Sequence, residues 1–196
     1  SRFTKRSKKI WRNEFEEKTT ELFNKIVRKG QVAVDIGANI GYYTHLFSTL
    51  VGKRGKVFSF EPEPKNFEIL AKNSFPNTII EEKALADKTG STELYLSEES
   101  DGLHSIVSEK GGDSIVVETV SLDSYLSDFE RKVDIVKIDV EGAEKKVLDG
   151  MEYRLSSDRP DLVIEYTHFL PSNKKLLERL SGLGYSFYTI GERGKT

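Results

Sequence analysis

A short apolar run that ends in a glycine-bearing turn constrains this chain more than any other feature of its sequence. The run begins at Val32, passes through Asp35 to Gly37, and continues to Gly41, where the pattern of a helix starts. Glycine allows the tight turn and the close packing of helix on strand, and between the glycines the backbone can approach a bound ligand closely. The pattern predicts a strand, a turn and a helix of the kind that holds a nucleotide-like cofactor.

A glutamate at the end of the next apolar run supports this prediction. Residues 56–60 form that run, and Glu61 follows them, 26 positions after Asp35. In βαβ units that bind nucleosides, an acid that accepts hydrogen bonds from the ribose hydroxyls follows at an interval of roughly 20 residues. The alternative is a glycine turn in an unrelated α/β protein with Glu61 merely solvated, and the paired acid makes that interpretation the weaker one.

The turn differs from the diphosphate-binding pattern of dinucleotide oxidoreductases. Those enzymes carry G-x-G-x-x-G, which brings a helix N-terminus to a pyrophosphate. This chain has D-x-G-x-N-x-G instead. An anion at Asp35 would repel phosphates and favour an ammonium or a sulfonium. S-adenosylmethionine carries both cations and no phosphate, so the turn favours it over a nicotinamide cofactor.

Five motifs together resemble the FkbM-type S-adenosylmethionine-dependent methyltransferases. They are VAVDIGANIGYYT, GKVFSFEPEPKNFEIL, EKALADKTGSTELYL, GLHSI and VDIVKIDVEGAE, and they follow one another over residues 31–151 in the family's order and at its usual separations. The combination is far more specific than any single motif. The resemblance implies an α/β, Rossmann-like class I methyltransferase fold, a mostly parallel sheet flanked by helices. It also implies an enzyme that O-methylates a hydroxyl on a sugar, a glycan or a small natural product.

The resemblance also implies a cofactor site. The glycine turn would line the methionine part of S-adenosylmethionine, Glu61 would hold the ribose, and Pro62 with a later turn would border the adenine. The full set of expected cofactor contacts is Asp35, Gly37, Ala38, Asn39, Gly41, Tyr42, Glu61, Pro62, Lys83, Ala84, Leu85 and Asp139. Each neighbour taken alone could equally be a core residue.

Acids at the ends of successive strands are the candidates for the chemistry. Ligands of open α/β sheets bind beyond the carboxyl ends of the strands. Since the sulfonium is already activated, the enzyme must mainly align an acceptor and remove its proton. Asp139 is the first candidate for that base, with cofactor binding or capping of the following helix as its alternative role. Glu141 and Glu165 complete the predicted catalytic set and are expected to orient the acceptor's hydroxyls.

The same acids could bind a divalent ion, because oxygen ligands suit magnesium or calcium. Nothing in their spacing requires it, so no metal site is predicted. Substrate contacts are expected from His104 and Ser105 in a polar loop and from His168 after the fifth strand of the sheet. A histidine there could act as a base near neutral pH, and its alternative is a solvated side chain.

Alternating patterns predict the architecture around this site. Residues 1–30 are expected to form an amphipathic helix, over 7–29, that packs on a single cofactor-binding domain of residues 31–196. Strands are expected at 31–36, 56–61, 78–84, 133–138, 162–166 and 185–190, and helices at 40–51, 64–74, 121–128, 142–152 and 172–182. This alternation is the βαβ pattern of a parallel sheet. Residues 91–96 and 114–120 are expected to form an inserted β-hairpin, and the sheet is expected to lack the C-terminal seventh strand that this fold normally carries.

Composition narrows the functional classes. The chain has no cysteine, which excludes a disulfide framework and a thiolate nucleophile. Its apolar runs are far shorter than the roughly 20 residues of a membrane span, and no signal peptide is evident, so a soluble cytoplasmic protein is expected. The net charge of -2 makes nucleic acid an unexpected partner for the whole protein. The expected partner is a small-molecule or glycan acceptor.

Three alternative functions stay open. A nucleic-acid methyltransferase is supported only by the basic stretch from Arg2 to Arg12, which contains no acid. A catalytically silent S-adenosylmethionine-binding module would keep the fold and lose the strand-end acids, which are present. A nicotinamide oxidoreductase should show the diphosphate glycine pattern, which is absent. The sequence identifies neither the acceptor nor the oligomeric state.

Overall fold

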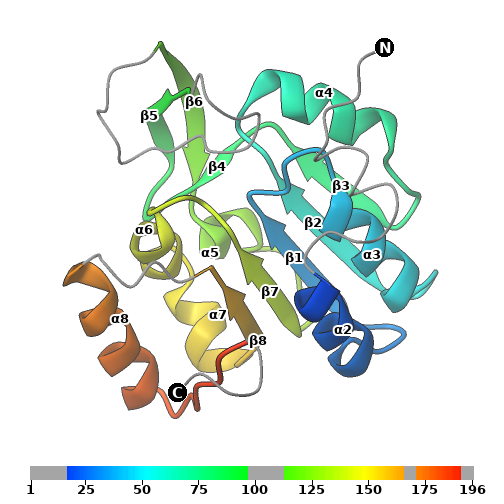
Figure 1. Cartoon of the computed structure of the whole chain (residues 1–196), viewed down its shortest axis with the longest axis vertical. Coiled ribbons are helices and arrows are strands. Elements are labelled where there is room, and N and C mark those ends of the chain that lie inside the picture. The colour runs from blue at the N-terminus through cyan, green and yellow to red at the C-terminus, as the bar shows by residue number, and fades with distance from the viewer. Residues whose placement is uncertain (1–16, 97–112, 166–170, 191–196) are drawn as a thin grey trace.

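A computed structural model describes residues 17–96, 113–165 and 171–190 of the chain (Figure 1). Its centre is a five-stranded sheet in the order β3-β2-β1-β7-β8, and every neighbouring pair is parallel. The strands are β1 (Val32–Ile36), β2 (Lys56–Phe60), β3 (Thr78–Glu81), β7 (Ile135–Ile138) and β8 (Asp161–Ile164). The chain builds outward from β1 to β3 and then returns to β7 on the other side of β1. The strand order therefore reverses at β1, where open α/β sheets bind their ligands.

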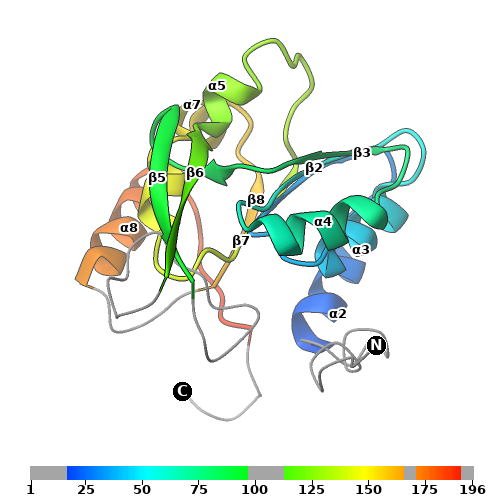
Figure 2. The same ribbon diagram turned by 90° about the horizontal axis from the view of Figure 1, so that it is seen from above.

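Helices cover both faces of this sheet, as Figure 2 shows. On one face lie α2 (Glu17–Ile26), α3 (Tyr42–Val51) and α4 (Pro64–Lys72), and the side chains of Phe23 and Phe47 pack there against Ala33 and Val57. On the other face lie α5 (Leu122–Tyr125), α6 (Glu144–Asp149), α7 (Glu152–Ser157) and α8 (Pro171–Gly182). Since both faces are covered, the strands are apolar almost throughout, as parallel strands must be.

A second, three-stranded sheet stands beside the first. It contains β4 (Ala84–Leu85), β5 (Gly90–Tyr95) and β6 (Ser114–Val120) in the order β4-β6-β5. β5 and β6 pair antiparallel, so the predicted hairpin is confirmed, and β4 adds to it in parallel. A small core of Ala84, Leu94 and Val117 holds this sheet together.

Most predicted elements are present, with bounds that differ by a few residues, but three predictions need correction. The strand expected over 78–84 ends at Glu81, and the chain then crosses to the second sheet, where Ala84 and Leu85 pair with β6. The helix expected over 142–152 is divided into α6 and α7 at Gly150. A Cβ atom on Gly150 would collide with the carbonyl oxygen of Ala86, so the break follows from close packing against the loop after β4.

The strand expected over 185–190 is wrong. These residues have no regular secondary structure, because the chain turns back around the end of α8. The N–H groups of Leu183 and Tyr185 donate to carbonyls of α8, and the Tyr185 ring packs against the core. β8 is consequently the edge of the sheet in the described part of the chain. The predicted N-terminal helix is confirmed over Glu17–Ile26. Its predicted first part, residues 7–16, and the basic stretch from Arg2 to Arg12 lie outside the described residues.

Candidate functional site

A cleft lies at the carboxyl ends of β1, β2 and β7, between the two sheets. Of the predicted site residues, those that line it are Gly37, Ala38, Asn39, Tyr42, Glu61, Pro62, Lys83, Ala84, Leu85, Asp139 and Glu141. Asp35, Gly41 and Glu165 lie outside the lining. The three predicted substrate contacts His104, Ser105 and His168 fall outside the described residues. The structure thus brings together residues that are more than a hundred positions apart in the sequence.

The glycine turn after β1 is shaped by left-handed backbone and by close contacts. Gly37 has φ +72°, Asn39 +52° and Gly41 +96°. The N–H groups of Gly37 and Ala38 both donate to the carbonyl oxygen of Phe60, at 3.0 Å. A Cβ on Gly37 would collide with the carbonyl oxygen of Asp139, and one on Gly41 would lie 2.8 Å from Leu70 Cδ1. Glycine at 37 therefore lets the turn pack on the loop after β7 and leaves its backbone open to the cleft.

Glu61 braces this turn from the end of β2. Its side chain is buried, Oε2 accepts a 2.7 Å hydrogen bond from the Asn39 N–H, and Oε1 accepts one of 3.0 Å from the Glu63 N–H. Burial raises the pKa of Glu61 to about 7, and the two N–H donors oppose that rise only in part. An ionised carboxylate has about four lone-pair sites, so Glu61 can accept further hydrogen bonds from a ligand in the cleft.

A buried lysine organises the other side of the turn. Lys137 Nζ lies 3.3 Å from Asp35 Oδ1 and 3.4 Å from Asp139 Oδ2, and it donates a 2.9 Å hydrogen bond to the carbonyl oxygen of Gly37. The second oxygen of Asp35 accepts a 2.7 Å hydrogen bond from the Thr44 hydroxyl. Asp35 is fully buried behind Lys137, so the structure does not support the predicted direct contact between Asp35 and a cofactor. Of this ion pair, Lys137 lines the cleft and Asp35 does not.

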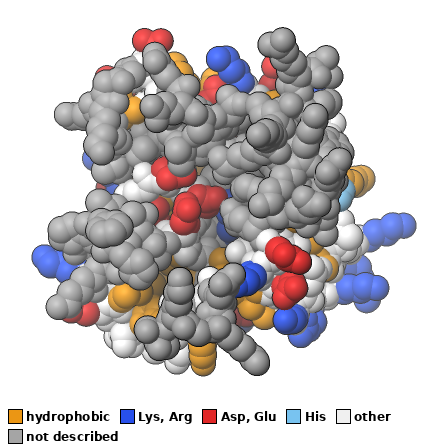
Figure 3. Space-filling view, viewed as in Figure 1, with side chains coloured by type: hydrophobic (Ala, Val, Ile, Leu, Met, Phe, Trp, Pro, Cys, Tyr) orange, Lys and Arg blue, Asp and Glu red, His pale blue; other side chains and the backbone are white. Residues whose placement is uncertain are grey.

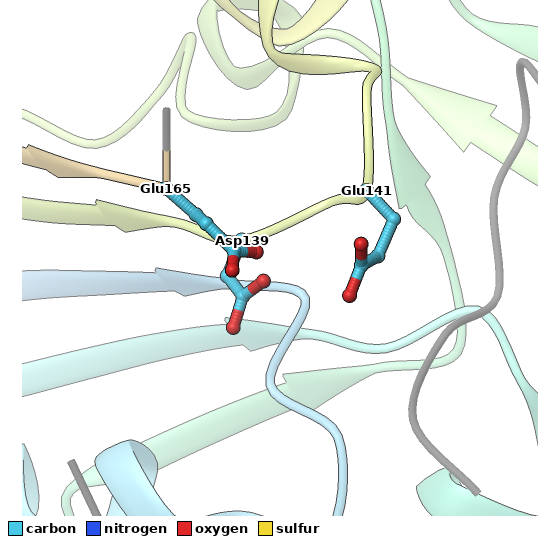
Figure 4. Close-up of side chains that lie close together, drawn as sticks. All are labelled: Asp139, Glu141 and Glu165. Atoms are coloured by element: carbon cyan, nitrogen blue, oxygen red, sulfur yellow. The ribbon is translucent and has the colours of Figure 1, made fainter. Parts of the chain in front are cut away.

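Three carboxylates gather just beyond the carboxyl ends of β7 and β8, where Asp139 and Glu141 line the cleft and Glu165 lies next to them (Figure 4). One oxygen of each of Asp139, Glu141 and Glu165 lies within 4.8 Å of the others, and acidic side chains are visible in a hollow of this face in Figure 3. Main-chain pairing fixes two of them, because the Asp139 N–H donates to Ile36 and the Glu165 N–H to Ile138. Clustered carboxylates repel one another unless a cation or hydrogen-bond donors compensate, and the ammonium of Lys137 is the cation at Asp139. Oxygen ligands of this kind could also hold magnesium or calcium.

The backbone of Glu141 stands in the left-handed region, with φ +50°, and Gly142 follows at +104°. The Gly142 N–H donates a 2.9 Å hydrogen bond to the buried side chain of Glu144, which braces this turn from below. A non-glycine residue at positive φ carries strain that the surrounding structure must hold. This conformation leaves Glu141 outside α6, where it lines the cleft.

The opposite end of the cleft is more apolar. Ala84 and Leu85 reach it from β4 and Leu94 from β5, and all three are buried. Lys83 lines the same end and forms a 3.2 Å ion pair with Glu118 of β6. Such a wall, apolar with one charged rim, suits the flat face of an aromatic ring.

Lys137, Asn66 and Leu94 line the cleft but are not among the predicted site residues, although the two-residue spacing of Lys137 and Asp139 predicts that both face the same side. Lys137 carried a signal, since it is the only charged residue within the apolar strand β7 and alternates with Asp139 along it. Asn66 and Leu94 carried none, because an asparagine early in a helix and a leucine in a hairpin are ordinary residues. Their place in the cleft depends on how α4 and β5 pack.

A family model described as the methyltransferase FkbM domain matches residues 35–187. The chain belongs to the FkbM methyltransferase family. It is 33% identical over 166 residues to a hexuronic acid methyltransferase from Haloferax volcanii, a match that covers 80% of this chain and 66% of that protein. It is 24% identical over 159 residues to a tRNA (adenine(57)-N(1)/adenine(58)-N(1))-methyltransferase from Methanocaldococcus jannaschii, which covers 81% of this chain and 52% of that protein. The chain thus spans between about half and two thirds of these relatives.

Solved structures share the fold. A methyltransferase FkbM from Methylobacillus flagellatus superposes with a TM-score of 0.56 at 15% identity, over 84% of this chain and 44% of that one. An Aeropyrum pernix fibrillarin with natively bound S-adenosyl-L-methionine superposes with a TM-score of 0.52 at 13% identity, over 86% and 64% of the two chains. The predicted Rossmann-like class I methyltransferase fold is confirmed. Among the helices that the structure describes, none is long and apolar enough to cross a membrane.

Proposed function

We propose that this protein transfers the methyl group of S-adenosylmethionine to a hydroxyl of a sugar, a glycan or a small natural product. One observation carries the proposal: a single cleft at the reversal of strand order has Glu61 on one side of the glycine turn and Asp139 on the other. The Glu61 carboxylate can accept hydrogen bonds from the ribose of a nucleoside, and the Asp139 carboxylate can accept a proton. We further propose that residues 31–196 act as one cofactor-binding domain with the N-terminal helix packed on it.

The cofactor roles follow the walls of the cleft. Gly37, Ala38 and Asn39 would border the methionine part, with Tyr42 beside them, and Glu61 would accept hydrogen bonds from the ribose. Pro62 and the Lys83–Leu85 segment would border the adenine, where the wall is apolar. Gly41 and Asp35 would act indirectly, the former by letting α4 pack on α3 and the latter by holding Lys137. A bound S-adenosylmethionine supplies a methyl group that its sulfonium has already activated.

Asp139 is the proposed base. Asp139 would accept the proton of the acceptor hydroxyl as the acceptor oxygen takes the methyl group, and the carbon–sulfur bond of S-adenosylmethionine would break to leave S-adenosylhomocysteine. Lys137 holds that carboxylate at 3.4 Å and so fixes its direction. Glu141 and Glu165 would accept hydrogen bonds from neighbouring hydroxyls of the acceptor, which suits a sugar that presents several of them. His104, Ser105 and His168 are proposed as further acceptor contacts.

A sugar acceptor is also supported by the hexuronic acid methyltransferase, 33% identical to this chain. The tRNA methyltransferase relative supports nucleic acid as the second candidate acceptor. We do not propose a metal for the reaction, since the three carboxylates can serve as hydrogen-bond acceptors. Methyl transfer that stops with a chelator and returns with magnesium would overturn this choice.

Calorimetric titration tests the cofactor half of the proposal. S-adenosylmethionine and S-adenosylhomocysteine should bind saturably, and NAD should not. Preference for NAD, or no binding of any of the three, would contradict the proposed function. Protein that binds the first two is then screened with radiolabelled S-adenosylmethionine against neutral sugars, uronic acids, glycans and tRNA.

The Asp139→Asn variant tests the catalytic half. It should bind S-adenosylhomocysteine as the parent does and lose methyl transfer by roughly 10²–10⁴-fold, the usual contribution of a general base. Asp128→Asn is the matched control, because Asp128 is exposed and lies outside the cleft lining. Turnover retained in Asp139→Asn would leave Asp139 a positioning role at most.

A further inference from the structure

Asn66 of α4 is a polar residue in the wall of the cleft, and it is only 6% exposed. Its backbone N–H donates a 2.7 Å hydrogen bond to Glu63 Oε2, but within the part of the chain that the structure describes its amide oxygen and nitrogen make no hydrogen bond. The amide can both donate and accept hydrogen bonds, so it is available to a ligand in the cleft.

The position of Asn66 indicates which part of a ligand it meets. Leu70 lies one helical turn further along α4 and packs against Gly41, so residues on this face of α4 lie over the glycine turn. A chain of hydrogen bonds also leads from Asn39 to Glu61, from Glu61 to Glu63, and from Glu63 to Asn66. Asn66 is therefore linked to Glu61 through Glu63, and both residues line the cleft.

We propose that the Asn66 amide binds the ribose of the cofactor together with Glu61 and thereby selects a nucleoside with both hydroxyls. This inference rests on the proposed function, since it assigns a further residue to the same cofactor. A hydroxyl both donates and accepts, whereas an ionised carboxylate only accepts. Glu61 accepts hydrogen bonds from the ribose hydroxyls, and the oxygen atoms of those hydroxyls can in turn accept a hydrogen bond from a donor. In the described part of the chain, the NH₂ group of Asn66 is a cleft-lining donor that makes no hydrogen bond to the protein.

The test combines changes in the protein with changes in the ligand. Calorimetry compares S-adenosylhomocysteine with its 2′-deoxy and 3′-deoxy analogues on the parent protein and on Asn66→Leu. The variant should bind S-adenosylhomocysteine about tenfold more weakly, the cost of one lost hydrogen bond. On the parent protein, one deoxy analogue should bind more weakly than S-adenosylhomocysteine. On Asn66→Leu, that analogue and S-adenosylhomocysteine should bind almost equally, because the partner of the missing hydroxyl is already gone.

Two further variants make the result specific. Asn66→Asp keeps the shape and loses the donor, so it should bind as weakly as Asn66→Leu. Asn73→Leu makes the same change at the exposed end of α4 and should bind like the parent. Circular dichroism checks that each variant is folded.

Each other outcome overturns the inference. If both deoxy analogues lose the same factor on Asn66→Leu as on the parent, Asn66 does not contact the ribose. If the coupling appears instead with the 6-oxo (inosine) analogue of S-adenosylhomocysteine, Asn66 contacts the base. A parent protein that does not bind S-adenosylhomocysteine contradicts the proposed function itself, and this result is distinct from the other two.

Discussion

Glu61 combines burial with two backbone hydrogen bonds, and this combination sets how the protein should respond to pH. Its pKa is raised from 4.5 to about 7, mainly by burial, so the free protein takes up a proton there as the pH falls through 7. Only the ionised carboxylate can accept hydrogen bonds from two ribose hydroxyls while it also accepts from Asn39 and Glu63. We predict that affinity for S-adenosylhomocysteine is constant above pH 7 and falls below it, approaching tenfold per pH unit.

The same shift makes a prediction about the unliganded fold. A carboxyl group with a raised pKa favours the folded state most when it is protonated, so its contribution to the free energy of unfolding declines as the pH rises from 4.5 to about 7.

Titrations of the protein with S-adenosylhomocysteine at pH 5.5, 6.5, 7.5 and 8.5 measure how the affinity depends on pH. Glu61→Gln should bind weakly and with no such profile. A parent affinity that is flat over this range would show that Glu61 does not meet the ligand.

Lys137 should matter for stability as well as for the cleft. Its ammonium is the cation that faces the fully buried Asp35, and Lys137→Met would leave that carboxylate uncompensated. Removing one partner of a buried ion pair costs about 3–5 kcal/mol of the free energy of unfolding. Urea denaturation of Lys137→Met should show a loss of this order. Adding Asp35→Asn should recover part of it, because the uncompensated charge is then gone. Additive losses in the double variant would contradict the pairing.

At the scale of elements, the sequence predicted what depends on local patterns. The strand–turn–helix around Gly37, the helix α4 and the β5–β6 hairpin each follow from hydrophobic periodicity with glycine or proline at the ends, and these patterns survive packing. The strand ends also follow, which is why the acids Asp139, Glu141 and Glu165 could be expected at one edge. The distance between their carboxylate oxygens, at most 4.8 Å, could not be predicted from the sequence, because it depends on the strand order β1-β7-β8.

The errors arose where an element depends on a partner distant in sequence. Residues 185–190 are rich in aromatic side chains and have strand propensity, yet a strand needs a neighbour for its N–H and C=O groups, and here the chain bonds to the end of α8 instead. The switch of sheets between Glu81 and Ala84 has the same cause. Asn66 was missed because nothing in its local sequence shows that α4 turns this face toward the cleft.

At the break between α6 and α7, helix propensity and side-chain packing predict opposite effects of Gly150→Ala on the free energy of unfolding. Alanine is a better helix former than glycine by about 1 kcal/mol, so propensity alone predicts that Gly150→Ala stabilises the protein. The structure predicts the opposite, because the new methyl group would meet the carbonyl of Ala86 and lie 3.2 Å from Ser121 Cβ. We expect a loss of roughly 1–3 kcal/mol in the free energy of unfolding, measured by urea denaturation.

Gly182→Ala is the matched control for this change. It makes the same substitution at the end of α8, where nothing lies within 4 Å of the added atom, and should leave stability unchanged or slightly raised. A Gly150→Ala variant as stable as Gly182→Ala would mean that the loop after β4 moves aside easily.

At the scale of the whole molecule, the cleft lies between two sheets, of which the smaller has a core of its own at Ala84, Leu94 and Val117 and joins the main core through Leu85 and Val120. The five-stranded sheet contributes the glycine turn, Glu61 and Asp139, and the three-stranded sheet contributes Ala84, Leu85 and Leu94. A ligand with a polar end and an aromatic end would touch both sheets at once. Its binding free energy would then stabilise the small sheet against local opening, in addition to the walls of the large one.

Hydrogen–deuterium exchange should detect this link between the sheets. With saturating S-adenosylhomocysteine, backbone amides should exchange more slowly in residues 37–41 and 61–66 and also in β4 and β5, whose buried side chains line the far end of the cleft. Among the side chains that the structure describes, those of α8 do not line the cleft, so α8 serves as the internal control. Glu61→Ala at the same ligand concentration should lose the protection in both sheets together, because both depend on one bound molecule. Protection confined to the large sheet would show that the ligand does not reach Lys83, Ala84 and Leu85, and the adenine would then have to be placed elsewhere.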